Sequence, residues 1–281
     1  MDDLSTFHLA LFSIIGISTL ITVVAIVFAC LLPKKQPAQV FVINLLVSDL
    51  IQLISLIVTL MRVGFGVLLI FFFFGFIASV GFMVCISLDR YLFIAKPMWY
   101  ESRRKKLYTV LVCVAVWLLA GLFIVGAILD IIDDHYFIII VRIFGIFLLL
   151  PLPCFIFFVA GTIKVVSGAH SVPADEKRRI VSIVVAILLI YILLFLPVII
   201  YCLIPFDAHH MNVLFKVYSF TVPLSPIADS MLYVFLRKGL VDKLLAPLCC
   251  CKLSNNQQTV TMDTVGETVR VRLNTETSAD P

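Results

Sequence analysis

Apolar residues dominate this chain in long, nearly uninterrupted runs. Several runs reach about 18 residues or more, enough for a helix to cross the roughly 30 Å of hydrocarbon in a bilayer. The backbone must satisfy its own hydrogen bonds inside lipid, and this favours helices. A barrel would need short segments that alternate apolar and polar residues, and we find none. The pattern therefore predicts an all-α membrane protein.

Seven such runs can be placed along the sequence, and prolines inside three of them are expected to kink the helices. The predicted helices are His8–Leu32, Ala38–Met61, Phe65–Ile94, Leu107–Leu129, Phe137–Ser167, Lys177–Ile204 and Met211–Leu236. The interior prolines are Pro151, Pro153, Pro197, Pro223 and Pro226. We expect a seven-transmembrane helix bundle over residues 8–236, preceded by a short N-terminus over residues 1–7.

Composition and charge support this topology and give it an orientation. Hydrophobic residues make up 62% of the chain and charged residues 14%, against about 45–50% and about 25% in a soluble domain. Lysine and arginine favour the cytoplasmic side of a membrane. They are abundant in the loops after the first, third and fifth helices and after the last, whereas the opposite side holds only Arg62, Arg142 and Lys216. We therefore expect an extracellular N-terminus and a cytoplasmic C-terminus in the plasma membrane.

The segment after the seventh helix predicts two further parts. Residues 237–248 carry Leu240, Leu244 and Leu245 on one face, which is typical of a short amphipathic helix on the membrane surface. Residues 249–281 are polar and rich in serine and threonine, and we expect a disordered cytoplasmic tail that can engage arrestin. Three adjacent cysteines, Cys249, Cys250 and Cys251, are candidates for palmitoylation, with an unmodified tail as the alternative. Cys30, Cys85, Cys113 and Cys154 lie inside apolar runs, where we expect small buried side chains, and Cys202 lies near the outer end of such a run. We expect no disulfide framework.

A set of polar or special residues narrows the function. They are Asp49, five residues after Asn44 in the second helix; Asp89, Arg90 and Tyr91 at the end of the third; Trp117 in the fourth; Phe195 and Pro197 in the sixth; and Asp229 with Tyr233 in the seventh. In order, depth and spacing this set resembles the rhodopsin-like (class A) G-protein-coupled receptors, over nearly the whole chain. The resemblance implies a receptor that transmits binding of an extracellular ligand to an intracellular heterotrimeric G protein by outward movement of the sixth helix.

The same resemblance assigns a coupling switch. Its residues are Asp89, Arg90, Tyr91 and Tyr233. In the family the acid holds the arginine in the resting state, and the arginine meets the G protein when the sixth helix swings outward. Lys177 stands where some relatives carry an acid, so an ion pair from Arg90 to that position is not expected. An interfacial arginine that only reaches for the headgroups is the alternative.

A hinge is implied by Phe195 and Pro197, which match the aromatic-x-proline pattern of the family. Proline breaks a backbone hydrogen bond and allows the helix to pivot. Two further positions depart from the family pattern. Ser230 replaces the usual proline of the seventh helix, and the usual tyrosine of the fifth helix is missing near Val159 and Gly161.

A polar core is expected around Asp49, because an ionisable residue inside lipid is costly and is a functional hypothesis by default. The resemblance places Ser79 and Asp229 around the family's sodium site, and Ser225 lies one turn before Asp229. Such a group either holds an allosteric sodium ion or shares protons. A neutral cluster that only packs the helices is the alternative. The family's usual asparagine in the first helix is absent, and no other cofactor is expected.

The ligand stays open among a lipid acid, a nucleotide, a peptide and a proton. The candidate ligand pocket comprises Arg62, Phe72, Phe76, Arg142 and Lys216. Phe72 stands at the depth where amine receptors carry an acid, which excludes an aminergic pocket. The basic residues attract an anionic ligand or serve as interfacial anchors, and the rings line the cavity or face lipid and core.

Two further patterns bear on the ligand. Four histidines, His8, His135, His209 and His210, lie on the outer side near aspartates, and histidine titrates in the physiological range, which suggests proton sensing. The acidic outer loop equally suits a basic peptide. Residues 97–104 resemble the Mas-related receptors, whereas Asp89-Arg90-Tyr91 with Phe195 is similar to the nucleotide-, lipid- and proton-sensing branch.

Other functional classes are weaker. A membrane transporter or channel is the main alternative, but it predicts repeated halves or a chain of polar residues across the bilayer. We find only the cluster near Asp49. No metal motif or nucleophile–base pair falls at bilayer depth, so an enzyme is not expected. The partners expected are a G protein, arrestin, an extracellular ligand and the lipid bilayer, with no nucleic acid.

Overall fold

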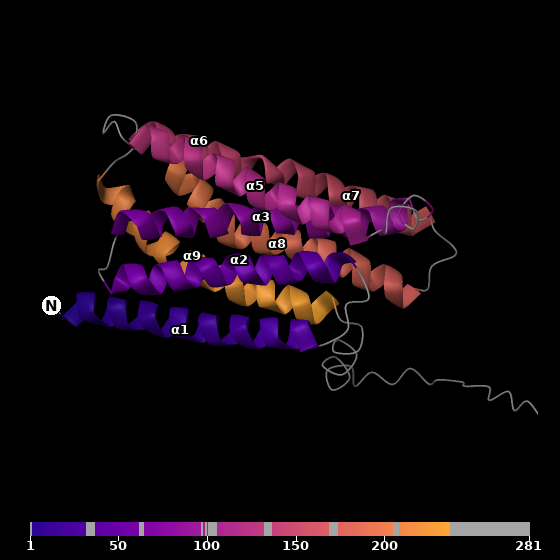
Figure 1. Cartoon of the computed structure of the whole chain (residues 1–281), viewed down its shortest axis with the longest axis horizontal. Coiled ribbons are helices and arrows are strands. Elements are labelled where there is room, and N and C mark those ends of the chain that lie inside the picture. The colour runs from indigo at the N-terminus through magenta and orange to yellow at the C-terminus, as the bar shows by residue number, and fades with distance from the viewer. Residues whose placement is uncertain are drawn as a thin grey trace, which may run out of the picture.

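Figure 1 shows a computed structural model of the chain, in which long helices lie side by side in an elongated bundle. The structure describes residues 2–31, 37–61, 65–96, 98, 100, 106–131, 137–168, 174–204 and 208–236. The helices in these ranges are α1 (Asp2–Leu31), α2 (Pro37–Leu60), α3 (Phe65–Ala95), α5 (Lys106–Ile131), α6 (Phe137–Leu149), α7 (Pro151–Gly168), α8 (Ala174–Leu203) and α9 (Ala208–Leu236).

These helices make a multi-pass membrane protein. Six segments of the described chain are long and apolar enough to cross a bilayer: Leu9–Leu31, Ala38–Leu60, Ile70–Ala95, Leu107–Val125, Arg142–Ser167 and Arg178–Leu203. The fifth segment, Arg142–Ser167, comprises most of α6 and most of α7. With α9, which has 29 residues and packs against α1, α2 and α8, they form the predicted seven-helix bundle. The predicted surface helix at 237–248 and the tail lie outside the described residues.

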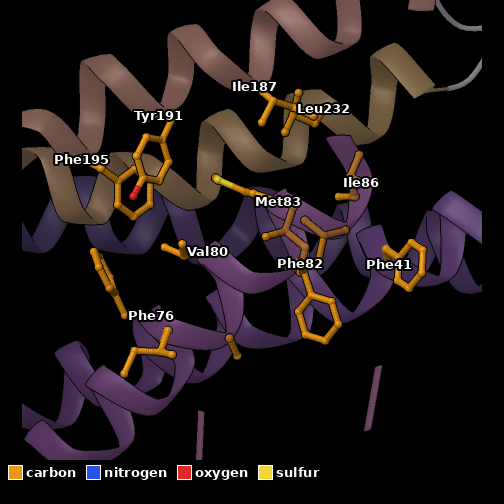
Figure 2. Packing of buried hydrophobic residues seen from close by; sticks show 14 of the residues in the cluster. Phe41, Phe76, Val80, Phe82, Met83, Ile86, Ile187, Tyr191, Phe195 and Leu232 are labelled. Carbon is orange, nitrogen blue, oxygen red and sulfur yellow. The ribbon is translucent and has the colours of Figure 1, made fainter. Parts of the chain in front are cut away.

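The third span is the centre of the bundle. Helix α3 packs against α2, α5, α7 and α8, whereas α1 lies at one edge against α2 and α9 (Figure 1). Val80 and Met83 of α3 are buried and point toward the side chains of α8 and α9 (Figure 2). On α5, leucines such as Leu118 and Leu122 point away from the bundle and are exposed. In a membrane those exposed apolar faces contact lipid chains rather than water.

The fifth span differs from its prediction as one continuous helix over Phe137–Ser167. Helix α6 ends at Leu149 and α7 begins at Pro151. Pro151 has no N–H, so the Phe147 carbonyl loses its usual helical donor. The Leu150 N–H donates to that carbonyl instead, at 3.3 Å, in a tighter turn. The expected proline kink is therefore a full interruption, whereas α8 and α9 continue through their interior prolines.

The five cysteines in the described ranges are all free thiols. Cys113 and Cys202 are buried, and Cys85 and Cys154 are partly buried. Cys30 is exposed on α1, so the expectation of a buried position is wrong for this residue. It lies between Ala29, which packs inward, and the exposed Leu31 at the end of the helix. Cys249, Cys250 and Cys251 lie outside the described part of the chain.

One close approach between α6 and α8 yields a stability test. A Cβ on Gly145 would lie 2.6 Å from Cys202 Cβ, and that atom cannot rotate away because it is bonded to the backbone. Gly145→Ala should therefore destabilise the bundle by about 1–3 kcal/mol, as other overpacked cores do. The measurement is the apparent Tm of the purified protein in detergent, followed by tryptophan fluorescence.

The matched control for that test is Gly121→Ala on α5, where nothing lies within 4 Å of the added methyl group. Alanine is the better helix former, so this variant should be neutral or more stable by up to about 1 kcal/mol. Equal apparent Tm values for the two variants would contradict the packing of α6 against α8.

Candidate functional site

The predicted polar core is assembled by three helices in the middle of the bundle. Asp49 comes from α2, Ser79 from α3, and Ser225 and Asp229 from α9. Asp49 and Asp229 are both 0% exposed, and the two serines are almost completely buried. The structure thus brings Asp49, Ser79 and Asp229 together, and Ser225 is buried on α9 one turn before Asp229.

Two carboxylates share this core. The Asp229 carboxylate lies close enough to Asp49 for their charges to repel. Asp49 Oδ1 accepts a hydrogen bond from Gln52 Nε2 at 3.3 Å. The Ser79 hydroxyl lies near Asp49 without reaching hydrogen-bond geometry. Among the described residues, Asp49 Oδ2 and both oxygens of Asp229 also have no hydrogen-bond partner.

The chemistry of these atoms fits a small cation. Carboxylate and hydroxyl oxygens are hard ligands of the kind that alkali and alkaline-earth ions prefer. Two carboxylates in an apolar bundle repel strongly, because little solvent screens their charges. A monovalent cation or a shared proton between Asp49 and Asp229 would relieve this repulsion. Among the described residues, we find no group of three or more His, Cys, Asp or Glu side chains for a metal ion, so a transition-metal site has no support there.

Ser225 has a second task, set by the proline after it. Pro226 lacks an N–H, so the Val222 carbonyl one turn earlier loses its usual helical donor. The Ser225 hydroxyl donates to this carbonyl at 3.0 Å. The proton of Ser225 is therefore engaged within α9, while its oxygen can still accept from the core.

The predicted coupling switch lies at the end of α3, where Asp89 and Arg90 are only 6% and 4% exposed. Arg90 Nη2 donates to Asp89 Oδ2 at 3.0 Å. The Tyr100 hydroxyl donates to the other carboxylate oxygen, Asp89 Oδ1, also at 3.0 Å. Asp89 is thus the acid that holds Arg90, as the sequence predicted, and Tyr100 holds Asp89.

Tyr91 explains one departure from the family pattern. Its ring packs against α7, with its centroid 5.8 Å from those of Phe157 and Phe158. A Cβ on Gly161 would lie 2.7 Å from Cε2 of this ring. A glycine at this place of the fifth span therefore makes room for Tyr91. Tyr233, the fourth residue of the predicted switch, is buried on α9.

Phe195 of the predicted hinge lies in an aromatic cluster that joins α3, α6, α7 and α8. Figure 2 shows three members of this cluster, Phe76, Tyr191 and Phe195. Phe195 is buried, stacks on Tyr191 at 4.8 Å, and lies 5.1 Å from Phe76 of α3. The Tyr191 hydroxyl donates to the Leu148 carbonyl. That carbonyl belongs to the last turn of α6, where a helix has no donors of its own left. Tyr191 therefore ties the hinge to the interruption of the fifth span.

The candidate ligand pocket is only partly brought together. Phe72 and Phe76 are buried, with ring centroids 5.8 Å apart. Arg142 is exposed on α6 and shares its face with the exposed Ile146, which is the position of an interfacial anchor. The backbone of Lys216 belongs to α9. Arg62, His135 and the side chains of Lys216, His209 and His210 lie outside what the structure describes.

Several polar residues of the interior were missed by the sequence analysis, and three of them join separate parts of the site or the bundle. Gln52 donates to Asp49, Tyr191 caps the Leu148 carbonyl, and the Ser18 hydroxyl donates to the Pro223 carbonyl at 2.7 Å, joining α1 to α9. The sequence offered a signal for two of these residues: Gln52 lies one turn from a buried acid, and Ser18 is a polar residue in a largely apolar first helix. Trp117, which was singled out, donates from Nε1 to Asn44 Oδ1 at 3.0 Å.

Comparison with known proteins adds independent findings. A family model described as 7 transmembrane receptor (rhodopsin family) matches residues 19–233. The type-1 angiotensin II receptor of Meriones unguiculatus is 38% identical over 112 residues, which are 36% of this chain and 31% of that receptor. The receptor of the same name from Homo sapiens gives the same values. The match therefore spans about a third of the length of these curated relatives.

Removal of the Tyr191 hydroxyl tests the link between α6 and α8. Tyr191→Phe keeps both ring contacts but leaves the buried Leu148 carbonyl without this donor. We expect a loss of about 1–3 kcal/mol, the cost of an unsatisfied buried acceptor, measured as a lower apparent Tm. The control is Thr19→Val on α1, whose hydroxyl donates only to the Ile15 carbonyl of its own helix, at 2.8 Å. A Tyr191→Phe protein as stable as the Thr19→Val protein would contradict the link.

Proposed function

Because the chain belongs to the rhodopsin family of seven-transmembrane receptors, we propose that it couples an extracellular ligand to an intracellular heterotrimeric G protein. The members of this family are receptors and not enzymes. Coupling occurs by outward movement of α8, the sixth span, which uncovers Arg90 at the predicted cytoplasmic end. The observation that carries this proposal is the buried ion pair of Asp89 and Arg90, to which the partly buried Tyr100 donates a hydrogen bond.

The resting state is maintained by two charge-assisted contacts on Asp89. The carboxylate accepts from Arg90 and from Tyr100, each at 3.0 Å. Hydrogen bonds to charged groups contribute about 1.5–3 kcal/mol each when they are buried. A signalling switch needs two arrangements that differ by only a few kcal/mol, so that an external ligand can reverse their populations. Contacts of this strength suit that requirement.

The signal reaches α8 through the aromatic cluster. Phe76 of α3 contacts Phe195 of α8, which stacks on Tyr191. Pro197 lies inside α8 two residues after Phe195, and a helix pivots most easily at such a proline. A ligand that displaces Phe76 would therefore act directly on the side chain beside the hinge.

The ligand binds on the predicted extracellular side of Phe72 and Phe76. Both rings are buried against the outer half of the bundle, so the innermost part of the ligand is apolar or aromatic. The relatives are receptors named for angiotensin II. Among the ligand classes considered from the sequence, the acidic outer loop around Asp133 and Asp134 suits a basic peptide.

The polar core supplies an allosteric site in the same proposal. Asp49, Ser79, Ser225 and Asp229 would hold a sodium ion, which supplies a positive charge between the two carboxylates and stabilises the resting packing of α2, α3 and α9. This is supported by the complete burial of both acids and by their oxygens that lack partners among the described residues. We further propose that the receptor lies in the plasma membrane with its N-terminus outside the cell. Its cytoplasmic tail binds arrestin and is palmitoylated at Cys249, Cys250 and Cys251.

Coupling to G protein can be tested without a ligand by a substitution that frees Arg90 from its ion pair with Asp89. Asp89→Asn weakens the ion pair, so the active arrangement gains about 1.5–3 kcal/mol relative to the resting one. Basal activity should then rise about tenfold or more, because 1.4 kcal/mol is a tenfold change in an equilibrium constant. The measurement is GTP analogue exchange, catalysed by receptor in nanodiscs, on purified heterotrimeric G proteins that contain Gαs, Gαi, Gαq or Gα12.

Two further variants make that result specific. Asp89→Asn combined with Arg90→Ala should return exchange to the level without receptor. Lys164→Ala removes an exposed charge of α7 outside the switch and should leave exchange unchanged. If folded Asp89→Asn receptor accelerates exchange on none of the four G proteins, the proposed function is wrong.

A further inference from the structure

Gln52 is a polar residue of the interior whose presence the proposed switch does not require. It lies one turn after Asp49 on α2 and is 1% exposed. Buried amide groups are costly unless each polar atom finds a partner. Its neighbour Leu53 and most of the surrounding core are apolar. A glutamine at this position therefore carries a cost that an apolar residue would not.

The two ends of this amide have different environments. Nε2 faces the Ser48 carbonyl at 3.4 Å and Asp49 Oδ1 at 3.3 Å. Both are acceptors, so a flipped amide would place its oxygen against two other oxygens. The orientation is thus set by chemistry. The other end, Oε1, is buried and has no hydrogen-bond partner among the residues that the structure describes.

Helix α3 closes over this side chain at a glycine. A Cβ on Gly75 would lie 2.7 Å from the Ser48 carbonyl oxygen and 2.9 Å from Gln52 Cγ. Gly75 is buried, and no larger residue fits between the two backbones. The stem of Gln52 is therefore held in place by α3, and its amide has little freedom to turn away from the polar core.

We propose that Gln52 is a cation-positioning residue of the polar core, which holds Asp49 by its N–H and offers its amide oxygen to a small monovalent cation. This inference rests on the cation site of the proposed function. A neutral oxygen adds a hard ligand without a third negative charge beside Asp49 and Asp229. Gln52 follows Asp49 by one turn of α2, toward the predicted extracellular end.

The test is the sodium dependence of thermal stability in the full-length receptor. Apparent Tm is measured in nanodiscs against NaCl concentration, with choline chloride keeping the ionic strength constant. Gln52→Leu should raise the half-saturating sodium concentration about tenfold or more, as loss of a residue that orients a metal ligand commonly does. Asp49→Asn should abolish the response.

Two companion variants keep this test decisive. Ser55→Ala removes a hydroxyl one turn further along α2 that donates only to the Ile51 carbonyl at 2.8 Å, and it should leave the half-saturating concentration unchanged. Gln52→Asn keeps an amide but withdraws its oxygen by one methylene. It should weaken sodium binding in the same direction if Gln52→Leu does not fold.

The outcomes separate the two proposals. A wild-type response that Asp49→Asn abolishes, but that both Gln52 variants leave at the same half-saturating concentration, overturns the role of Gln52 and leaves the sodium site intact. A wild-type protein whose apparent Tm does not depend on sodium overturns both. An equal loss in Ser55→Ala would show general loosening of α2 and also overturns the role of Gln52.

Discussion

Two carboxylates, Asp49 and Asp229, lie within interaction range of each other in the middle of an apolar bundle. Burial of one charge is costly, and burial of two like charges is more so. The cost is acceptable only if something positive or a proton lies between them. This constraint draws α2, α3 and α9 around a common centre. It also makes their packing depend on what occupies that centre, which a ligand-operated receptor can use.

Hydroxyl groups resolve a second constraint, which comes from prolines and helix ends in lipid. A freed carbonyl finds no water there and needs a donor from the protein. Ser225 serves the Val222 carbonyl beside Pro226, and Tyr191 serves the Leu148 carbonyl beside the interruption before Pro151. Both hydroxyls lie next to proposed moving parts. The bonds that make these breaks tolerable therefore also connect the hinge and the polar core to neighbouring helices.

Much of this arrangement could be predicted from the sequence. Long apolar runs require helices in lipid, and a buried acid such as Asp49 must face the interior, so the bundle and the inward position of Asp49 followed from physical chemistry. Ser79 and Asp229 were assigned to the polar core by the resemblance to the family, and Ser225 by its place one turn before Asp229. Side-chain partners across helices followed from neither. The bonds of Gln52 and Tyr191 depend on which way each helix is rotated and how closely its neighbour approaches. Nor does the spacing of Pro151 and Pro153 distinguish a kink from a break. Cys30 faces outward because α1 lies at the edge, which its own sequence does not reveal.

A double-mutant cycle on the two carboxylates tests the central claim most directly. Asp49→Asn, Asp229→Asn and the double variant are compared by apparent stability in sodium-free nanodiscs. If the two charges repel across the core, either single substitution relieves the repulsion and raises stability. The double variant then gains less than the sum, with a coupling above about 0.5 kcal/mol. Strictly additive effects, or single variants that are both destabilised, would contradict the account.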